Sequence, residues 1–203
     1  MASACALGCN ISSPRNLPCV RHAVPSRIHP WCDLLLHACH LSACADFLRH
    51  AIVDLFRRTV SKVQVARPFT VEAEVFLPDH IHVLWTLPDG DHDYPTRVRL
   101  IKSAFSRSLV EGDVVRREPP SSRLLRGERT VWQRRYWEHT IRDERDFQAH
   151  LDYIHINPVK HQLVTAARDW AHSSFRVWVE RGVYDLSWGS GDLPVLPEWA
   201  GRE

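Results

Sequence analysis

Cysteine is absent from most of this sequence, and so are long hydrophobic runs. All six cysteines lie between Cys5 and Cys44, which excludes a scaffold held by disulfides over the rest of the chain. No run of about 18 apolar residues occurs, and the N-terminus lacks the basic and apolar regions of a secretory signal. We therefore expect a soluble, cytoplasmic protein that has no membrane partner.

Two zinc-dependent classes are disfavoured because their motifs are missing. Cys32, Cys39, His40 and Cys44 fit no zinc-finger spacing, since neither a second Cys-x-x-Cys nor a His-x-x-x-His accompanies them. Zinc deaminases need His-x-Glu together with Pro-Cys-x-x-Cys, and the sequence contains neither motif. With 203 residues, the chain is one ordinary domain or one small domain with extensions, and it is too short for the large barrel hydrolases that use His-x-His.

Basic residues are concentrated in one part of the chain, although the net charge is only +2. Residues 97–145 carry thirteen Arg or Lys against seven Asp or Glu, a local charge of about +6. Most of them are Arg, whose guanidinium binds phosphate through two hydrogen bonds and stacks on bases. The distribution indicates a polyanionic partner, and a solvated, salt-bridged surface is the alternative.

Helical spacing of apolar residues predicts three helices. The first covers residues 46–64, with Asp46 as its N-cap, and the second covers residues 97–110. The third starts near residue 142, and Pro158 should end it close to Asn157.

Alternating residues predict a β-hairpin with arms 70–76 and 81–86 around a turn at 77–79. A further short strand is expected within residues 131–139. An Arg-rich mobile loop over residues 111–130 precedes it, which would suit a clamp on nucleic acid.

Two histidines open the second arm of the hairpin. Because side chains alternate along a strand, His80 and His82 share one face with Leu84, and the other face is apolar and should pack on helices. Two neighbouring imidazoles can hold one metal ion. With 13 His in 203 residues, however, His-x-His is expected roughly 0.8 times by chance, so its meaning depends on context.

Tyr153 and Asn157 supply that context, because four residues apart on a helix they share a face. Two neutral imidazoles and an amide oxygen make an uncharged three-ligand shell for a divalent ion, with positions left for water and phosphate oxygens. A tyrosine beside such an ion can attack a phosphodiester and form a covalent phosphotyrosine. Taken singly, Tyr153 is also typical of a core aromatic, and Asn157 of a helix cap.

Four blocks of the sequence resemble the tyrosine transposases of the IS200-like group, within the His-hydrophobe-His superfamily of single-strand DNA endonucleases. The similarity is greatest to the members associated with repetitive extragenic palindromes. The blocks are Phe76-Leu-Pro-Asp-His-Ile-His82 with its continuation to residue 91, Ile101-Lys-Ser-Ala-Phe-Ser106, Trp132-Gln-Arg-Arg-Tyr-Trp-Glu-His139 with its continuation to residue 144, and Asp152-Tyr-Ile-His-Ile-Asn-Pro-Val-Lys-His161. Segments 169–175 and 184–189 are similar to the family's C-terminal part.

The resemblance implies an α+β, ferredoxin-like fold, in which helices cover one face of an antiparallel sheet and the nucleophile helix lies at the active face. It implies that His80, His82 and Asn157 bind Mg²⁺ or Mn²⁺ and that Tyr153 is the nucleophile. The expected enzyme is a metal-dependent transposase that cuts and rejoins single-stranded or hairpin DNA through a 5′-phosphotyrosine, as a monomer or homodimer. We expect its DNA contacts to include Lys102, Arg107, Arg123, Arg126, Arg129, Arg134, Arg135, Arg142, Trp132 and Tyr136.

Residues 1–45 depart from the family pattern, which opens with a central strand reading like Gly-Gly-x-Tyr-Phe-Phe-Thr-Val. We therefore expect residues 1–45 to be an atypical segment, disordered or altered by a shifted reading frame, followed by a catalytic domain at 46–165 and a C-terminal extension at 166–203. The apolar run at 31–38 is the one candidate to replace the missing strand. Without it the sheet would lose a member, and a catalytically inactive hairpin-DNA-binding protein is the alternative function.

Overall fold

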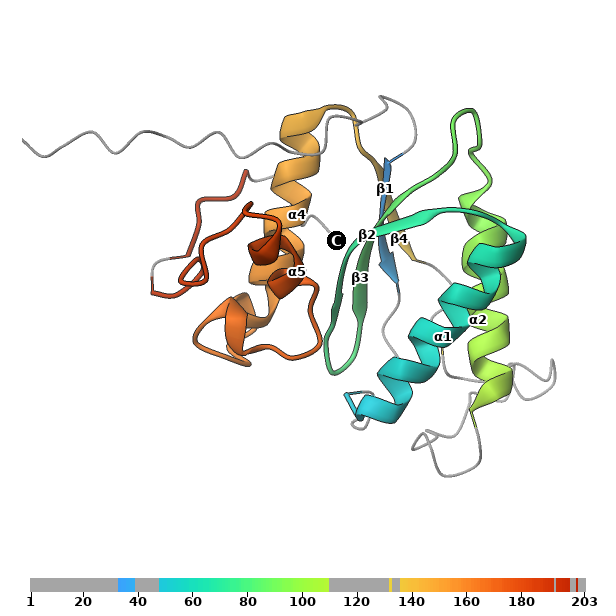
Figure 1. The fold of residues 1–203 in the computed structure, drawn as a ribbon, viewed down its shortest axis with the longest axis horizontal. Coiled ribbons are helices and arrows are strands. Elements are labelled where there is room, and N and C mark those ends of the chain that lie inside the picture. The colour runs from blue at the N-terminus through green and yellow to red at the C-terminus, as the bar shows by residue number, and fades with distance from the viewer. Residues whose placement is uncertain are drawn as a thin grey trace, which may run out of the picture.

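The computed structural model describes residues 48–109, 132, 136–191, 193–197 and 200, and the backbone alone of residues 33–38. These residues form a four-stranded antiparallel sheet with helices on both faces (Figure 1). The strands follow the order β2-β3-β1-β4 across the sheet. They are β1 (Asp33–Ala38), β2 (Thr70–Phe76), β3 (Ile81–Thr86) and β4 (Trp137–Thr140).

The predicted hairpin is confirmed with the expected bounds, because β2 and β3 pair antiparallel around the turn at 77–80. The short strand predicted within residues 131–139 is β4, which begins at Trp137 and ends at Thr140, one residue beyond that range. The run at 31–38 does supply a strand: β1 pairs with β3 on one side and with β4 on the other. The sheet therefore has its central member, although the sequence there does not match the family pattern.

The helices lie in two layers, as the fold-class prediction required. Helices α1 (His50–Ala66) and α2 (Tyr94–Ser108) cover one face of the sheet, and α4 (Glu144–Lys160) and the short α5 (Phe175–Glu180) cover the other (Figure 1). A 3-10 turn, η1 (Ala167–Asp169), connects α4 with α5. Within the part of the chain that the structure describes, no helix is long and apolar enough to cross a membrane.

Each face of the sheet has its own core, and strand β3 contributes to both. Ile81, Val83 and Trp85 are buried against α1 and α2, whereas Leu84 belongs to the core beneath α4 and α5. This alternation confirms the predicted division of the strand into an apolar face and a histidine face. Phe175 and Trp178 of α5 lie in the second core, so this helix packs on the same sheet.

Two helix starts differ from the prediction. Helix α2 begins at Tyr94, three residues before its predicted start, because the Asp93 side chain accepts a hydrogen bond from the backbone N–H of Thr96 and caps it. Helix α1 begins at His50, and Asp46, its predicted cap, lies outside the described residues.

One arginine of the basic region is part of the interior. Arg97 is buried and pairs with Asp91 through both carboxylate oxygens, at 2.6 and 3.1 Å, and it donates a further bond to the Pro68 carbonyl. A charge count made on the sequence therefore overstates the cations available to a ligand.

The end of α4 was predicted wrongly. The helix continues through Pro158 to Lys160. Proline removes one N–H donor from the helix, but only two helical residues follow it, so the loss is confined to the last turn. The N–H of His161 still donates to the Asn157 carbonyl at 2.9 Å, and Leu163 to the Pro158 carbonyl at 2.9 Å. Asn157 thus lies within the last turn, and the helix extends beyond it.

Buried His155 makes stability depend on pH. It lies in α4, its Nε2 is 2.9 Å from the Ser174 hydroxyl, and burial lowers its pKa from 6.5 to about 3. Between these values the unfolded chain binds a proton that the folded chain does not, so stability is lost as the pH falls below about 6.5.

We expect the free energy of unfolding to fall more steeply with acidification in the wild type than in His155→Gln, by up to about 1.4 kcal/mol per pH unit. Urea unfolding at several pH values from 7 to 5 measures this difference. Parallel curves for the two proteins would contradict the assignment.

Candidate active site

The fold brings the four residues of the predicted site together between β3 and α4. His80 directly precedes β3 and His82 lies within it, and their ring centroids are 4.9 Å apart. The ring of Tyr153 meets that of His82 edge-on at 5.3 Å. The amide nitrogen Nδ2 of Asn157 is 2.9 Å from Nε2 of His82. All four side chains are buried.

The periodicity of side chains along α4 and along β3 explains why these four residues lie together. Tyr153 and Asn157 are one helical turn apart and therefore project from the same face of α4. That face lies on the side of the sheet to which His82 and Leu84 point. Asp146 and His150 precede them at the same spacing, so a row of polar residues follows the sheet-facing side of the helix.

A carboxylate orients the first imidazole. Nδ1 of His80 is 2.7 Å from Oδ1 of Asp79, in the turn between β2 and β3. When Nδ1 donates its proton to this carboxylate, the lone pair of the ring is on Nε2, where a metal ion can be bound. Asp79 thus gives His80 the arrangement that is usual for metal-binding histidines.

The donor set fits a divalent ion. The buried Oδ1 of Asn157 has no hydrogen-bond partner among the described residues. Rotating the side-chain amide about its Cβ–Cγ bond exchanges its oxygen and nitrogen. The oxygen Oδ1 would then lie where Nδ2 now lies, 2.9 Å from Nε2 of His82. Neighbouring ligand atoms on an octahedral Mg²⁺ ion are about 3 Å apart, because each bond is about 2.1 Å long. Asn157 and His82 therefore offer ligand atoms at a suitable separation, and the His80 ring lies beside that of His82, with their centroids 4.9 Å apart.

Two residues just beyond Asn157 also reach the site, and the prediction missed both. The Lys160 ammonium lies over the Tyr153 ring, 4.7 Å from its centroid. The ring of His161 is 5.4 Å from that of His80. The helical periodicity could have identified Lys160, because it lies two turns after Tyr153 on the same face. That periodicity applies only if the helix is assumed to continue through Pro158.

The residues predicted to contact DNA lie on different parts of the fold. Lys102 of α2 lies over the rings of Trp132 and Tyr136, at 5.6 and 5.8 Å from their centroids, on the side of the sheet that α1 and α2 cover. Arg107 is exposed at the end of the same helix, whereas Arg142 stands at the start of α4. The other five, Arg123, Arg126, Arg129, Arg134 and Arg135, lie outside the described residues.

Trp132 has a structural role in addition to any contact with DNA. It is buried, packs against Phe56 and Phe105, and donates its indole N–H to the Lys102 carbonyl at 3.1 Å. Stacking on a base would require this ring to leave the core, and its DNA contact remains a prediction.

Comparison with known proteins gives related sequences and a related structure. The chain is 41% identical over 148 residues to the REP-associated tyrosine transposase of Escherichia coli (strain K12), a match that covers 73% of this chain and 74% of that protein. A relative from Haemophilus influenzae is 40% identical over 144 residues, which cover 70% of this chain and 80% of the relative. No protein-family model matches the chain.

A solved structure of a REP-associated tyrosine transposase bound to a REP hairpin superimposes on this chain with a TM-score of 0.64. The two chains are 32% identical, and the superposition covers 95% of this chain and 98% of the other.

Proposed function

The chain belongs to the family of REP-associated tyrosine transposases, and on this basis we propose that it cuts and rejoins single-stranded hairpin DNA through a phosphotyrosine formed on Tyr153. The observation that carries the proposal is the meeting of the Tyr153 ring, the His82 imidazole and the Asn157 amide at one buried site. A tyrosine placed only for packing would not need these polar neighbours.

In the proposed reaction the Tyr153 oxygen attacks a phosphodiester of the bound strand. The bond between phosphorus and the 3′ oxygen breaks, a bond from phosphorus to the tyrosine oxygen forms, and the leaving 3′ oxygen takes a proton. The 5′-phosphotyrosine keeps the energy of the broken bond, so a 3′ hydroxyl can reverse the step and join the strands without ATP. Since Tyr153 is 2% exposed, the side chains around it must shift for the strand to reach its hydroxyl.

His80, His82 and Asn157 would hold a Mg²⁺ or Mn²⁺ ion in this site. When bound, such an ion polarises the phosphodiester and stabilises charge on the leaving oxygen. The chain's own residues set up its surroundings, because Asp79 fixes the orientation of His80 and α4 holds Asn157 against His82. The Lys160 ammonium beside the Tyr153 ring stabilises negative charge on the tyrosine as its proton leaves.

Hairpin DNA is the substrate class that best suits the chain. The related structure contains a REP hairpin, and the basic residues of region 97–145 supply cations for phosphates. Strand β1 in the middle of the sheet favours an active enzyme over the inactive DNA-binding alternative, since it supports β3, which carries His82.

A nicking assay tests this proposal. The purified chain is incubated with an end-labelled hairpin oligonucleotide that has single-stranded flanks, with Mn²⁺, with Mg²⁺ or with EDTA. We expect a shortened strand and a protein–DNA adduct that survives denaturing electrophoresis, with both products absent in EDTA. Hairpin binding without cleavage or adduct in either metal would instead establish the inactive DNA-binding function.

A further inference from the structure

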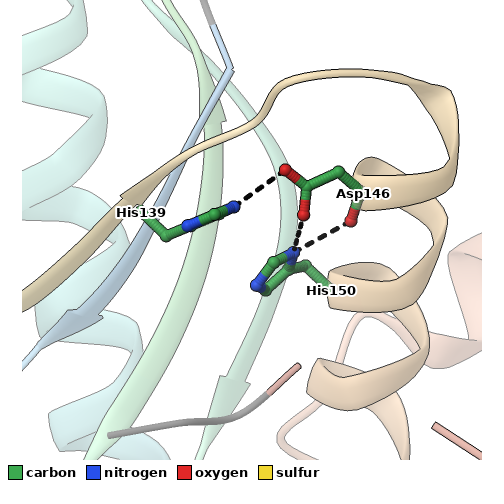
Figure 2. A group of neighbouring side chains, drawn as sticks. All are labelled: His139, Asp146 and His150. Carbon is green, nitrogen blue, oxygen red and sulfur yellow. Dashed lines mark hydrogen bonds and ion pairs between the residues drawn. The ribbon is translucent and has the colours of Figure 1, made fainter. Parts of the chain in front are cut away.

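A second cluster of metal-binding side chains lies at the other end of the polar row on α4. His139 of β4, Asp146 and His150 place one ligand atom each within 4.8 Å of one another. Nε2 of His139 is 2.8 Å from Oδ2 of Asp146, and Nδ1 of His150 is 3.0 Å from Oδ1 of the same carboxylate (Figure 2). The three side chains converge from the strand and the first turns of the helix.

One oxygen of Asp146 is buried without a hydrogen-bond donor. Arg142 and His139 donate to Oδ2, but Oδ1 has no hydrogen-bond partner among the described residues, and the Asp146 side chain is 2% exposed. Nδ1 of His150 lies close to Oδ1, yet its hydrogen bond is to the main-chain oxygen of Asp146 at 2.9 Å. A buried carboxylate oxygen without a donor costs free energy, and a bound ion would remove that cost.

The protonation states also suit a metal ion. Burial acts to raise the pKa of Asp146, but the hydrogen bonds from His139 and Arg142 outweigh it and keep the pKa below its ordinary value. Burial lowers the pKa of His150, so its ring is neutral at pH 7. Its Nδ1 now donates to the main-chain oxygen of Asp146, and it would bind an ion once the single ring proton is on Nε2 instead. The competing cation is Arg142, whose side chain is 65% exposed and can turn into solvent at little cost.

We propose that His139, Asp146 and His150 bind a second divalent metal ion, of the zinc class, apart from the ion expected at His80, His82 and Asn157. Two imidazole nitrogens and one carboxylate oxygen form a ligand set that zinc prefers over magnesium. Tetrahedral zinc holds its ligand atoms about 3.4 Å apart, so side-chain shifts on the order of 1 Å suffice. The ion would join β4 to α4 one turn before Tyr153. The inference does not depend on the proposed function.

Metal counting on defined variants tests this site. The six cysteines are first alkylated, so that they bind no zinc, and His80→Ala/His82→Ala serves as the background protein to remove the other site. After removal of metal with a chelator, Zn²⁺ is titrated against a chromogenic competitor, and Co²⁺ is added separately to report tetrahedral coordination by its visible absorption. We expect about one equivalent of Zn²⁺ per chain in this background.

Adding His139→Ala or Asp146→Asn should remove that equivalent and the Co²⁺ absorption, whereas the control His92→Ala, which replaces an exposed histidine, should keep both. Circular dichroism checks that each variant is folded. We expect His139→Ala to disturb the fold less than Asp146→Asn, because the His139 side chain is 24% exposed, whereas the buried Asp146 side chain also accepts a hydrogen bond from the Arg142 backbone N–H.

Different experimental results would contradict each of the two metal sites. No Zn²⁺ in the background protein, or Zn²⁺ that persists in folded His139→Ala, would overturn the second site and leave the cluster as a hydrogen-bonded clamp between β4 and α4. An unchanged metal dependence of cleavage in His82→Ala would overturn the first site alone.

Discussion

Tyr153→Phe should form no covalent adduct with hairpin DNA while its affinity for the hairpin stays within about threefold of the wild type. The substitution removes only the attacking oxygen, and the ring can keep its edge contact with His82. Adduct is measured by denaturing electrophoresis, and affinity by fluorescence anisotropy of the labelled hairpin. The separation of the two readouts distinguishes loss of chemistry from loss of binding.

Tyr136→Phe is the matched control for this experiment. Tyr136 also lies beside a lysine, with Lys102 5.8 Å from its ring centroid, but it packs in the core under α1 and α2, on the other side of the sheet from His82. The variant should form adduct at the wild-type level. Adduct in Tyr153→Phe together with its loss in Tyr136→Phe would reverse the assignment of the nucleophile.

His82→Ala should lower the rate of cleavage at saturating hairpin by roughly 100- to 1000-fold in Mn²⁺, because the loss of a ligand removes several kcal/mol of charge stabilisation. The residual rate should also need more Mn²⁺ to reach half its maximum. Initial rates over a series of Mn²⁺ concentrations measure both effects.

His172→Ala controls for the loss of a buried histidine. His172 is 8% exposed, and its ring contacts the rings of His50 and Trp170. We expect this variant to be less stable but to show the wild-type dependence on Mn²⁺. If His82→Ala showed that dependence as well, His82 would not be a metal ligand.

The fold was predictable from the sequence where the spacing of apolar residues within one helix or strand determined the structure. Residues 81–86 alternate between an apolar face and a histidine face, and the two cores follow this alternation. The hairpin and the helix that carries Tyr153 were found for the same reason. Pairing between distant strands leaves no such local signal, so the place of β1 between β3 and β4 could not be derived from its own residues.

The candidate site was predictable as far as Asn157 and no further. Lys160 and His161 were missed because Pro158 was taken as the end of the helix. Both nevertheless stand at helical spacing from predicted site residues, Lys160 from Tyr153 and His161 from Asn157. The cluster around Asp146 was missed for another reason. It needs His139 from β4, and a contact between a strand and the next helix has no fixed spacing in sequence.

Burial was the least predictable property. Trp132 was predicted to contact DNA and Arg97 was counted in the basic region because of their residue types, yet both are packed inside the protein. Arg97 has an internal acid as its partner, and Trp132 has a main-chain carbonyl. The sequence reveals a cation or an aromatic ring but does not reveal which internal group will satisfy it.

Peptide mass spectrometry of the trapped adduct tests the central claim most directly. Trypsin should release residues 146–160 as one peptide, which contains Tyr153 and no other of the four tyrosines. After reaction with hairpin DNA and digestion of the DNA by nuclease, we expect the remaining nucleotide on this peptide, joined through a 5′ phosphate to Tyr153. A nucleotide found on the peptide of Tyr94, Tyr136 or Tyr184 instead would contradict the account.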